Sequence, residues 1–93
     1  MTEAELERLV ILVEEAAEVQ QIAMKIIRHG YASHNPFDES KMSNRYLLEK
    51  ELGDLVFALG LLMASGDVSE KRIQDFKWKK KETIGKYLHH NEV

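Results

Sequence analysis

Hydrophobic residues recur every three or four positions along the first part of the chain, which is the spacing of one helix face. The segment opens with Thr2 and Glu5, a capping-box pair, and the pattern runs to about His29 before Gly30. We therefore expect a first helix over this segment. Its main stripe consists of Leu6, Leu9, Val13, Ala16, Gln20, Ala23 and Ile27.

The pattern breaks between Tyr31 and Met42, where polar residues surround the only proline, Pro36. These residues predict a loop. Ser43 is a suitable N-cap for a second helix, which we expect to run to about Ser65.

Gly66 and Asp67 end the second helix, and Ser69 can cap a third helix that reaches about Tyr87. No segment shows the alternation typical of a strand, so the predicted class is all-α. Ninety-three residues are enough for one domain, residues 1–93, but not for a second core. We expect an antiparallel helical hairpin followed by a third helix.

The second helix is apolar on almost every side between Leu52 and Ala64. A helix of this kind needs partners all round. Two other helices of one short chain do not easily surround it. We therefore expect a homodimer or tetramer in which a second copy completes a four-helix-type bundle.

Two pairs of acidic residues interrupt the apolar stripes. Glu15 and Glu18 share one face of the first helix, and Glu51 and Asp54 share one face of the second. In an antiparallel hairpin, Glu18 lies roughly 17 Å from the loop end, and Glu51 and Asp54 lie roughly 12 and 17 Å from it. The two pairs are therefore predicted to face each other at similar height.

Carboxylates are costly to bury unless something compensates their charge. Four that converge favour a hard divalent cation, with Mg²⁺ as the first expectation and Mn²⁺ as the alternative. Such an ion can polarise a phosphoryl oxygen and orient a leaving group, as phosphoanhydride hydrolysis requires. Either acidic pair alone would more often be a solvent-facing helix surface.

Charge is unevenly distributed, although the formal net charge is only −3. Residues 1–20 hold six acids and one base, whereas residues 71–86 hold seven of the thirteen lysines and arginines. The two regions could meet at a site that binds a metal and an anion together. The negative net charge and the absence of a recognisable nucleic-acid-binding motif argue against nucleic acid as a partner.

Two further features of the sequence restrict the possible partners and the possible cellular compartments. The longest apolar stretch, Leu55 to Ala64, is too short to span a bilayer, so no membrane partner is expected. The chain has no cysteine, which excludes disulfides and thiolate metal sites. Both features are compatible with a cytoplasmic location.

The acidic motifs resemble a known signature. Glu14-Glu15-x-x-Glu18 followed by Glu51-x-x-Asp54 is similar to the EExxE…ExxD pattern of the MazG-like all-α nucleoside triphosphate pyrophosphohydrolases. This superfamily includes all-α dUTPases, dCTP pyrophosphatases and phosphoribosyl-ATP pyrophosphatase. The resemblance spans about residues 12–89, and its context includes Lys25 to Gly30, Asn35-Pro36-Phe37, Asn44-Arg45 and Lys86-Tyr87-Leu88.

The resemblance implies Mg²⁺-dependent cleavage of a (d)NTP to (d)NMP and pyrophosphate, in nucleotide-pool control. By motif match, the metal ligands would be Glu15, Glu18, Glu51 and Asp54. Glu14 and Glu15 are the candidate catalytic residues. Glu14 lies about 100° round the helix from Glu15, and could serve a second metal, orient water or cap the edge of the cluster.

One position departs from the family pattern. Relatives often carry two acids before the Leu-Gly/Ala-Asp segment, whereas this chain has Lys50-Glu51. Since Glu51 still occupies the ligand position, we expect the change to affect only the rim of the site.

Four residues are candidates for binding substrate. Lys25 follows Glu18 by seven residues and could reach a phosphate, or be a surface lysine. Asn44 precedes Glu51 by seven residues and could bind substrate or cap its helix. Lys77 and Lys81 share a face of the third helix and could neutralise a triphosphate.

A function from another class also fits these features. The chain could be a catalytically silent helical dimer that binds a nucleotide or a partner protein. Its acidic residues would then be a relic or a regulatory cation site.

Overall fold

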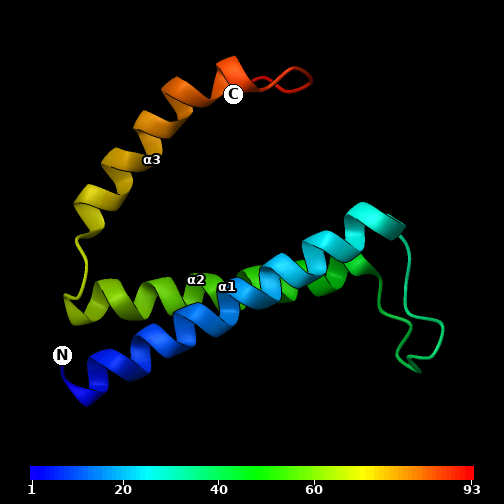
Figure 1. Ribbon diagram of the computed structural model, residues 1–93, viewed down its shortest axis with the longest axis horizontal. Coiled ribbons are helices and arrows are strands. Elements are labelled where there is room, and N and C mark those ends of the chain that lie inside the picture. Colours follow the sequence, from blue (N-terminus) through cyan, green and yellow to red (C-terminus); the bar gives the residue numbers. More distant parts are fainter.

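The computed structural model describes all 93 residues, as three α-helices and a short 3₁₀ turn without strands (Figure 1). The predicted all-α class and the order of the helices are confirmed. The third helix ends three residues before the expected position, where the chain tightens into the 3₁₀ turn. The elements are α1 (Glu3–His29), α2 (Asn44–Ser65), α3 (Glu70–Ile84) and η1 (Gly85–Tyr87).

The two ends of α1 follow the predicted chemistry. The Thr2 hydroxyl accepts a hydrogen bond from the Glu5 amide at 3.0 Å, and the Glu5 carboxylate accepts one from the Thr2 amide at 2.9 Å. These hydrogen bonds lower the pKa of Glu5. At the other end, Gly30 has a φ of 90°, which a residue with a Cβ rarely adopts, so the helix stops there.

α1 and α2 lie side by side and run in opposite directions, as the loop between them predicts (Figure 1). Ile22 of α1 and Ala58 and Leu62 of α2 are the three buried hydrophobic residues of the chain. Ile22 lies on the loop side of Glu18, and Ala58 and Leu62 follow Asp54 on the side away from the loop, so the buried positions are spread along the hairpin.

A pair of charged side chains closes the end of the hairpin that lies opposite the loop. Arg8 donates hydrogen bonds from Nε and Nη2 to the two Asp67 carboxylate oxygens, at 2.5 and 3.0 Å. Arg8 holds the pKa of Asp67 below its usual value. This two-point contact joins the start of α1 to the residues just after α2.

Asn44 closes the loop end of the hairpin. Its backbone amide donates to Ser33 O at 2.8 Å, and its side-chain Nδ2 donates to Gly30 O at 3.1 Å. Ser43, not Asn44, is the N-cap of α2, and its hydroxyl accepts a hydrogen bond from the Tyr46 amide. The alternative in which Asn44 caps its own helix is therefore wrong, because its side chain binds the C-terminal cap of α1 instead.

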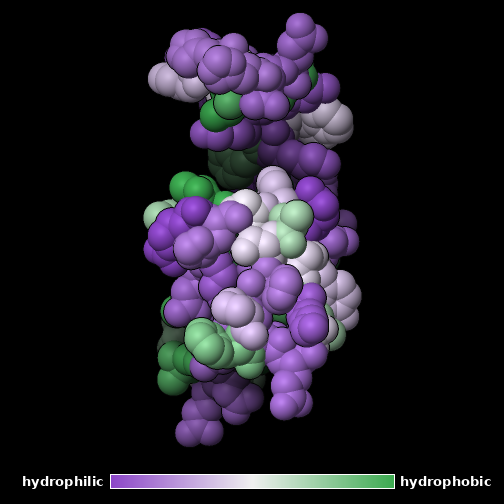
Figure 2. Space-filling model, turned by 90° about the vertical axis from the view of Figure 1, so that its right-hand side faces the viewer, coloured by the Kyte–Doolittle hydropathy of each residue, from purple (hydrophilic) through white to green (hydrophobic).

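α3 projects away from the hairpin and buries none of its residues (Figure 1). Its aromatic residues Phe76 and Trp78 are exposed, as are Val56 (67%) and Phe57 (65%) of α2. Seen from the loop side, hydrophobic residues reach the surface of the hairpin, and α3 stands apart from it (Figure 2). Within one chain, α2 is thus not enclosed on every side. No helix has the length and hydropathy needed to cross a membrane.

We expect the Asp67→Asn variant to unfold at a lower temperature than the wild type at neutral pH, because Arg8 loses its charged partner. The pKa of Asp67 is lowered from 3.8, so the pair stabilises the fold fully above that pH. Its contribution is lost as the pH falls through the lowered pKa. Thermal unfolding followed by circular dichroism should therefore show the difference between the proteins shrink in acid.

The matched control is Asp75→Asn. Asp75 pairs with Lys71 at 2.9 Å, but these side chains are 62% and 86% exposed, against 17% and 24% for Asp67 and Arg8. Exposed pairs of this kind contribute little. An equal loss of stability in both variants would show that the Arg8–Asp67 contact does not anchor the hairpin.

Candidate metal centre

The two acidic pairs meet between the helices. Glu15 and Glu18 come from α1, and Glu51 and Asp54 come from α2. One carboxylate oxygen from each residue lies within 4.8 Å of the corresponding oxygens of the others. The antiparallel register inferred from the residue spacing is therefore confirmed, and the four acids form one group, here called the acidic cluster.

The acidic cluster is strained electrostatically. Glu15 Oε2 and Glu51 Oε2 are both buried and have no hydrogen-bond partner. The pKa of Glu51 is raised, first by a hydrogen bond with the Glu18 carboxyl that requires a shared proton, and then by burial and repulsion from Glu18. Buried, unpartnered carboxylate oxygens are rare in folded proteins and call for a compensating group.

Lys50 supplies part of that compensation. Its ammonium lies 3.2 Å from Asp54 Oδ2 and 3.5 Å from Glu51 Oε1. The hydrogen bond to Asp54 and the two negative charges raise the pKa of Lys50. Lys50, whose side chain is 58% exposed, thus contacts two of the four acids, and these contacts were not predicted. The i, i+4 spacing of Lys50 and Asp54 in the sequence indicates that these two side chains can pair on one helix face.

The donor set fits a hard divalent cation. All four groups offer carboxylate oxygens, which are the preferred ligands of Mg²⁺. A cation there would give the orphaned oxygens of Glu15 and Glu51 a partner, which Lys50 does not do. No thiolate or imidazole belongs to the group, so softer ions have no favoured ligand in it.

A cleft of about 480 Å³ opens beside the acidic cluster. Glu18 and Glu51 form its acidic wall, and Lys25 and Arg28 of α1 also line it. The structure therefore places Lys25 next to two of the predicted metal ligands. Arg28 was not predicted, although it lies three residues beyond Lys25 and ten beyond Glu18, on the same side of the helix.

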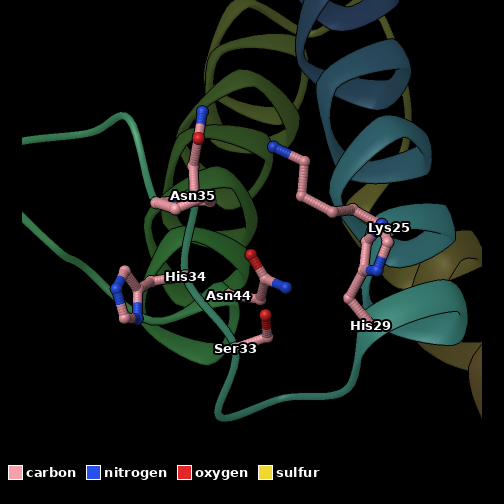
Figure 3. A pocket seen from close by; sticks show the side chains of 7 residues that line it. Lys25, His29, Ser33, His34, Asn35 and Asn44 are labelled. Atoms are coloured by element: carbon pink, nitrogen blue, oxygen red, sulfur yellow. The ribbon is translucent and has the colours of Figure 1, made fainter.

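A second, polar pocket of about 220 Å³ lies between the loop end of the hairpin and Lys25 (Figure 3). Asn44, a predicted substrate-binding residue, lines this pocket rather than the cleft. His29, Ser33 and His34 also line it. They come together only because the loop folds back over the end of α1.

Three candidate residues lie elsewhere. Glu14 is exposed on α1 and is not part of the acidic cluster. Lys77 and Lys81 lie on α3, do not line the cleft or the polar pocket, and approach the Trp78 ring, each with its ammonium 5.3 Å from the ring centre. One chain alone thus does not bring these lysines to the acidic cluster.

Comparison with protein-family models, with curated proteins and with solved structures gives no significant match.

We expect Mg²⁺ to stabilise the folded protein, since it relieves repulsion that exists only in the folded state. At about a hundred times its Kd, a ligand of this kind raises the free energy of unfolding by about 2.7 kcal/mol. Denaturant titration with Mg²⁺ and with excess chelator measures this difference.

The Glu51→Gln variant should lose most of the response to Mg²⁺, while its metal-free form is at least as stable as the wild type, because one repulsive charge is gone. Glu49→Gln is the control, since Glu49 is exposed and outside the acidic cluster. An unchanged Mg²⁺ response in Glu51→Gln would rule out the acidic cluster as the binding site.

Proposed function

We propose that this protein is a Mg²⁺-dependent nucleoside triphosphate pyrophosphohydrolase that converts (d)NTP to (d)NMP and pyrophosphate in nucleotide-pool control. One observation carries the proposal. Four carboxylates from two antiparallel helices converge within 4.8 Å, and two of their oxygens are buried without a partner. The motif resemblance to MazG-like enzymes supports the same reaction class.

The acidic cluster is the proposed Mg²⁺ site, with Glu15, Glu18, Glu51 and Asp54 as ligands and Mn²⁺ as an alternative ion. When bound, the ion supplies charge neutralisation and polarisation of phosphoryl oxygens. Lys50 partly balances Glu51 and Asp54 in the absence of the ion.

Lys25 and Arg28 give the cleft a positive side next to its acidic wall. A triphosphate bridging these two sides meets cations along its length, because phosphate oxygens pair with ammonium and guanidinium groups. This arrangement favours a multiply charged phosphate chain over a neutral ligand in the cleft.

The reaction also needs a group that accepts a proton from the attacking water. Glu15, the second acid of the Glu14-Glu15-x-x-Glu18 motif and a member of the acidic cluster, is the proposed catalytic carboxylate. Glu14 lies outside the acidic cluster, and its proposed role is to orient water from the edge.

Pyrophosphate release from the eight common (d)NTPs tests the proposal. We expect release that depends on Mg²⁺ and falls by more than about 100-fold in Glu18→Gln and Asp54→Asn, because loss of even an outer partner of a metal ligand costs up to that factor. Glu92→Gln in the exposed tail is the control and should keep full activity.

The outcome also separates the two functional classes. Nucleotide binding without release of pyrophosphate from any substrate would contradict the hydrolase proposal and favour a catalytically silent helical binder.

We also propose that a second copy of the chain covers the exposed apolar surface, as a homodimer or tetramer with a four-helix-type bundle. Three buried hydrophobic side chains make a very small core for 93 residues. α3 is basic and the first half of α1 is acidic, so the α3 helix of one copy complements α1 of another. That packing lets Lys77 and Lys81 serve the site of the partner.

Sedimentation velocity at micromolar concentration tests this assembly. The wild type should sediment as a dimer or larger, whereas Phe57→Glu should shift toward monomer, because it places a charge in the proposed interface. Phe37→Glu is the matched control, since Phe37 lies on the loop and is 92% exposed. A compact wild-type monomer would contradict the assembly.

A further inference from the structure

The polar pocket at the loop end has a composition unlike that of the acidic cleft. Six of its seven lining residues carry polar or charged side chains, and none of them is acidic. The seventh is Pro36. Lys25 lines both the pocket and the cleft, so the two spaces adjoin at this lysine. A ligand held by its phosphates in the cleft can therefore extend past Lys25 into the pocket.

Asn44 gives this pocket a fixed hydrogen-bond acceptor. The residue is 2% exposed, and its Nδ2 donates to Gly30 O at 3.1 Å. Rotating the amide by 180° would set two carbonyl oxygens against each other, so its orientation is determined. The side-chain oxygen takes no hydrogen bond from the chain, and Figure 3 shows it directed into the space between Asn35 and Lys25.

Asn35 differs from Asn44 in that its side-chain oxygen is paired and its side-chain nitrogen is unpaired. Its Oδ1 accepts a hydrogen bond from the Phe37 amide at 2.9 Å, which leaves its Nδ2 free to donate. His29 adds ring nitrogens that can act as donor or acceptor. The pocket therefore offers one fixed acceptor, at least one free donor and one adaptable group.

A fixed carbonyl oxygen discriminates between ligands. It repels a phosphate oxygen but accepts a hydrogen bond from a neutral N–H or O–H group. A site built to pair with such a group also rejects analogues that lack it, because its own polar atom is then left unpaired. The pocket is thus suited to the uncharged, donor-bearing end of a nucleotide.

We propose that this pocket receives the nucleoside end of the substrate, and that Asn44 Oδ1 accepts a hydrogen bond from a base N–H or a sugar O–H. The inference rests on the proposed function for the identity of the ligand. Lys25 lies at the boundary between the phosphate-binding cleft and the nucleoside pocket.

The test follows the side-chain amide of Asn44 by NMR in the full-length wild-type protein. The probes are the four ribonucleoside 5′-monophosphates, ribose 5-phosphate and inorganic pyrophosphate. At least one monophosphate should shift the Asn44 signal, and pyrophosphate should leave it in place. If ribose 5-phosphate shifts it equally, the donor is the sugar; if only base-bearing probes do, the donor is the base.

A variant locates the ligand without disturbing the buried asparagine. His29→Ala should weaken binding of the active monophosphate by about fivefold, the loss of one ordinary hydrogen bond. It should leave the stabilisation by Mg²⁺ unchanged. His90→Ala, a change of the same kind in the exposed tail, is the control and should bind as the wild type does.

Two results would overturn the proposal. In one, no monophosphate shifts the Asn44 signal; in the other, pyrophosphate shifts it as strongly as the nucleotides do. Neither measurement needs turnover. If a monophosphate shifts the Asn44 signal but the protein releases no pyrophosphate from any nucleotide, only the hydrolase proposal is refuted. If the protein hydrolyses nucleotides but no monophosphate shifts the Asn44 signal, only the assignment of the pocket is refuted.

Discussion

The pairing of α1 with α2 is the interaction on which the rest of the structure depends, because it brings four mutually repelling carboxylates together. Burial of Ile22 on α1 and of Ala58 and Leu62 on α2 accompanies the pairing of the two helices, which brings Glu15 and Glu51 into a space where one oxygen of each has no partner. Lys50 offsets only part of the charge. The fold thus holds an unfavourable arrangement of charge, and the proposed binding of a small multivalent cation would relieve it and stabilise the hairpin.

The register of that arrangement depends on two contacts at opposite ends of the hairpin. Arg8 and Asp67 join the ends distant from the loop, and Asn44 joins the loop ends through Gly30 O. A helix displaced by one turn would break both contacts and separate the acidic pairs. The four carboxylates therefore lie on two helices whose register is fixed at both ends, which is the kind of support that the proposed metal site needs.

The sequence predicted the helices, their caps and the acidic cluster, because each depends on local spacing or on a simple count of helical rise. Thr2, Ser43 and Ser69 cap their helices as expected. The hydrogen bond from Asn44 to Gly30 O and the contacts of Lys50 with two acids were not predicted. Asn44 binds a residue fourteen positions away, and Lys50 combines a local pairing with a cluster formed by another helix, so both roles depend on how the hairpin closes. The polar pocket likewise depends on the path of the loop, which no periodicity describes.

The direct link between Gly30 and Asn44 has a consequence for how this chain can change. Ser33 O accepts a hydrogen bond from the Asn44 amide, and Tyr31 O accepts one from the Arg45 amide, so the hairpin is already closed before residue 34. Residues 34–42 form an excursion whose length and composition can vary without sliding the helices past each other. This segment can therefore change during evolution while the charged centre between the helices stays in place.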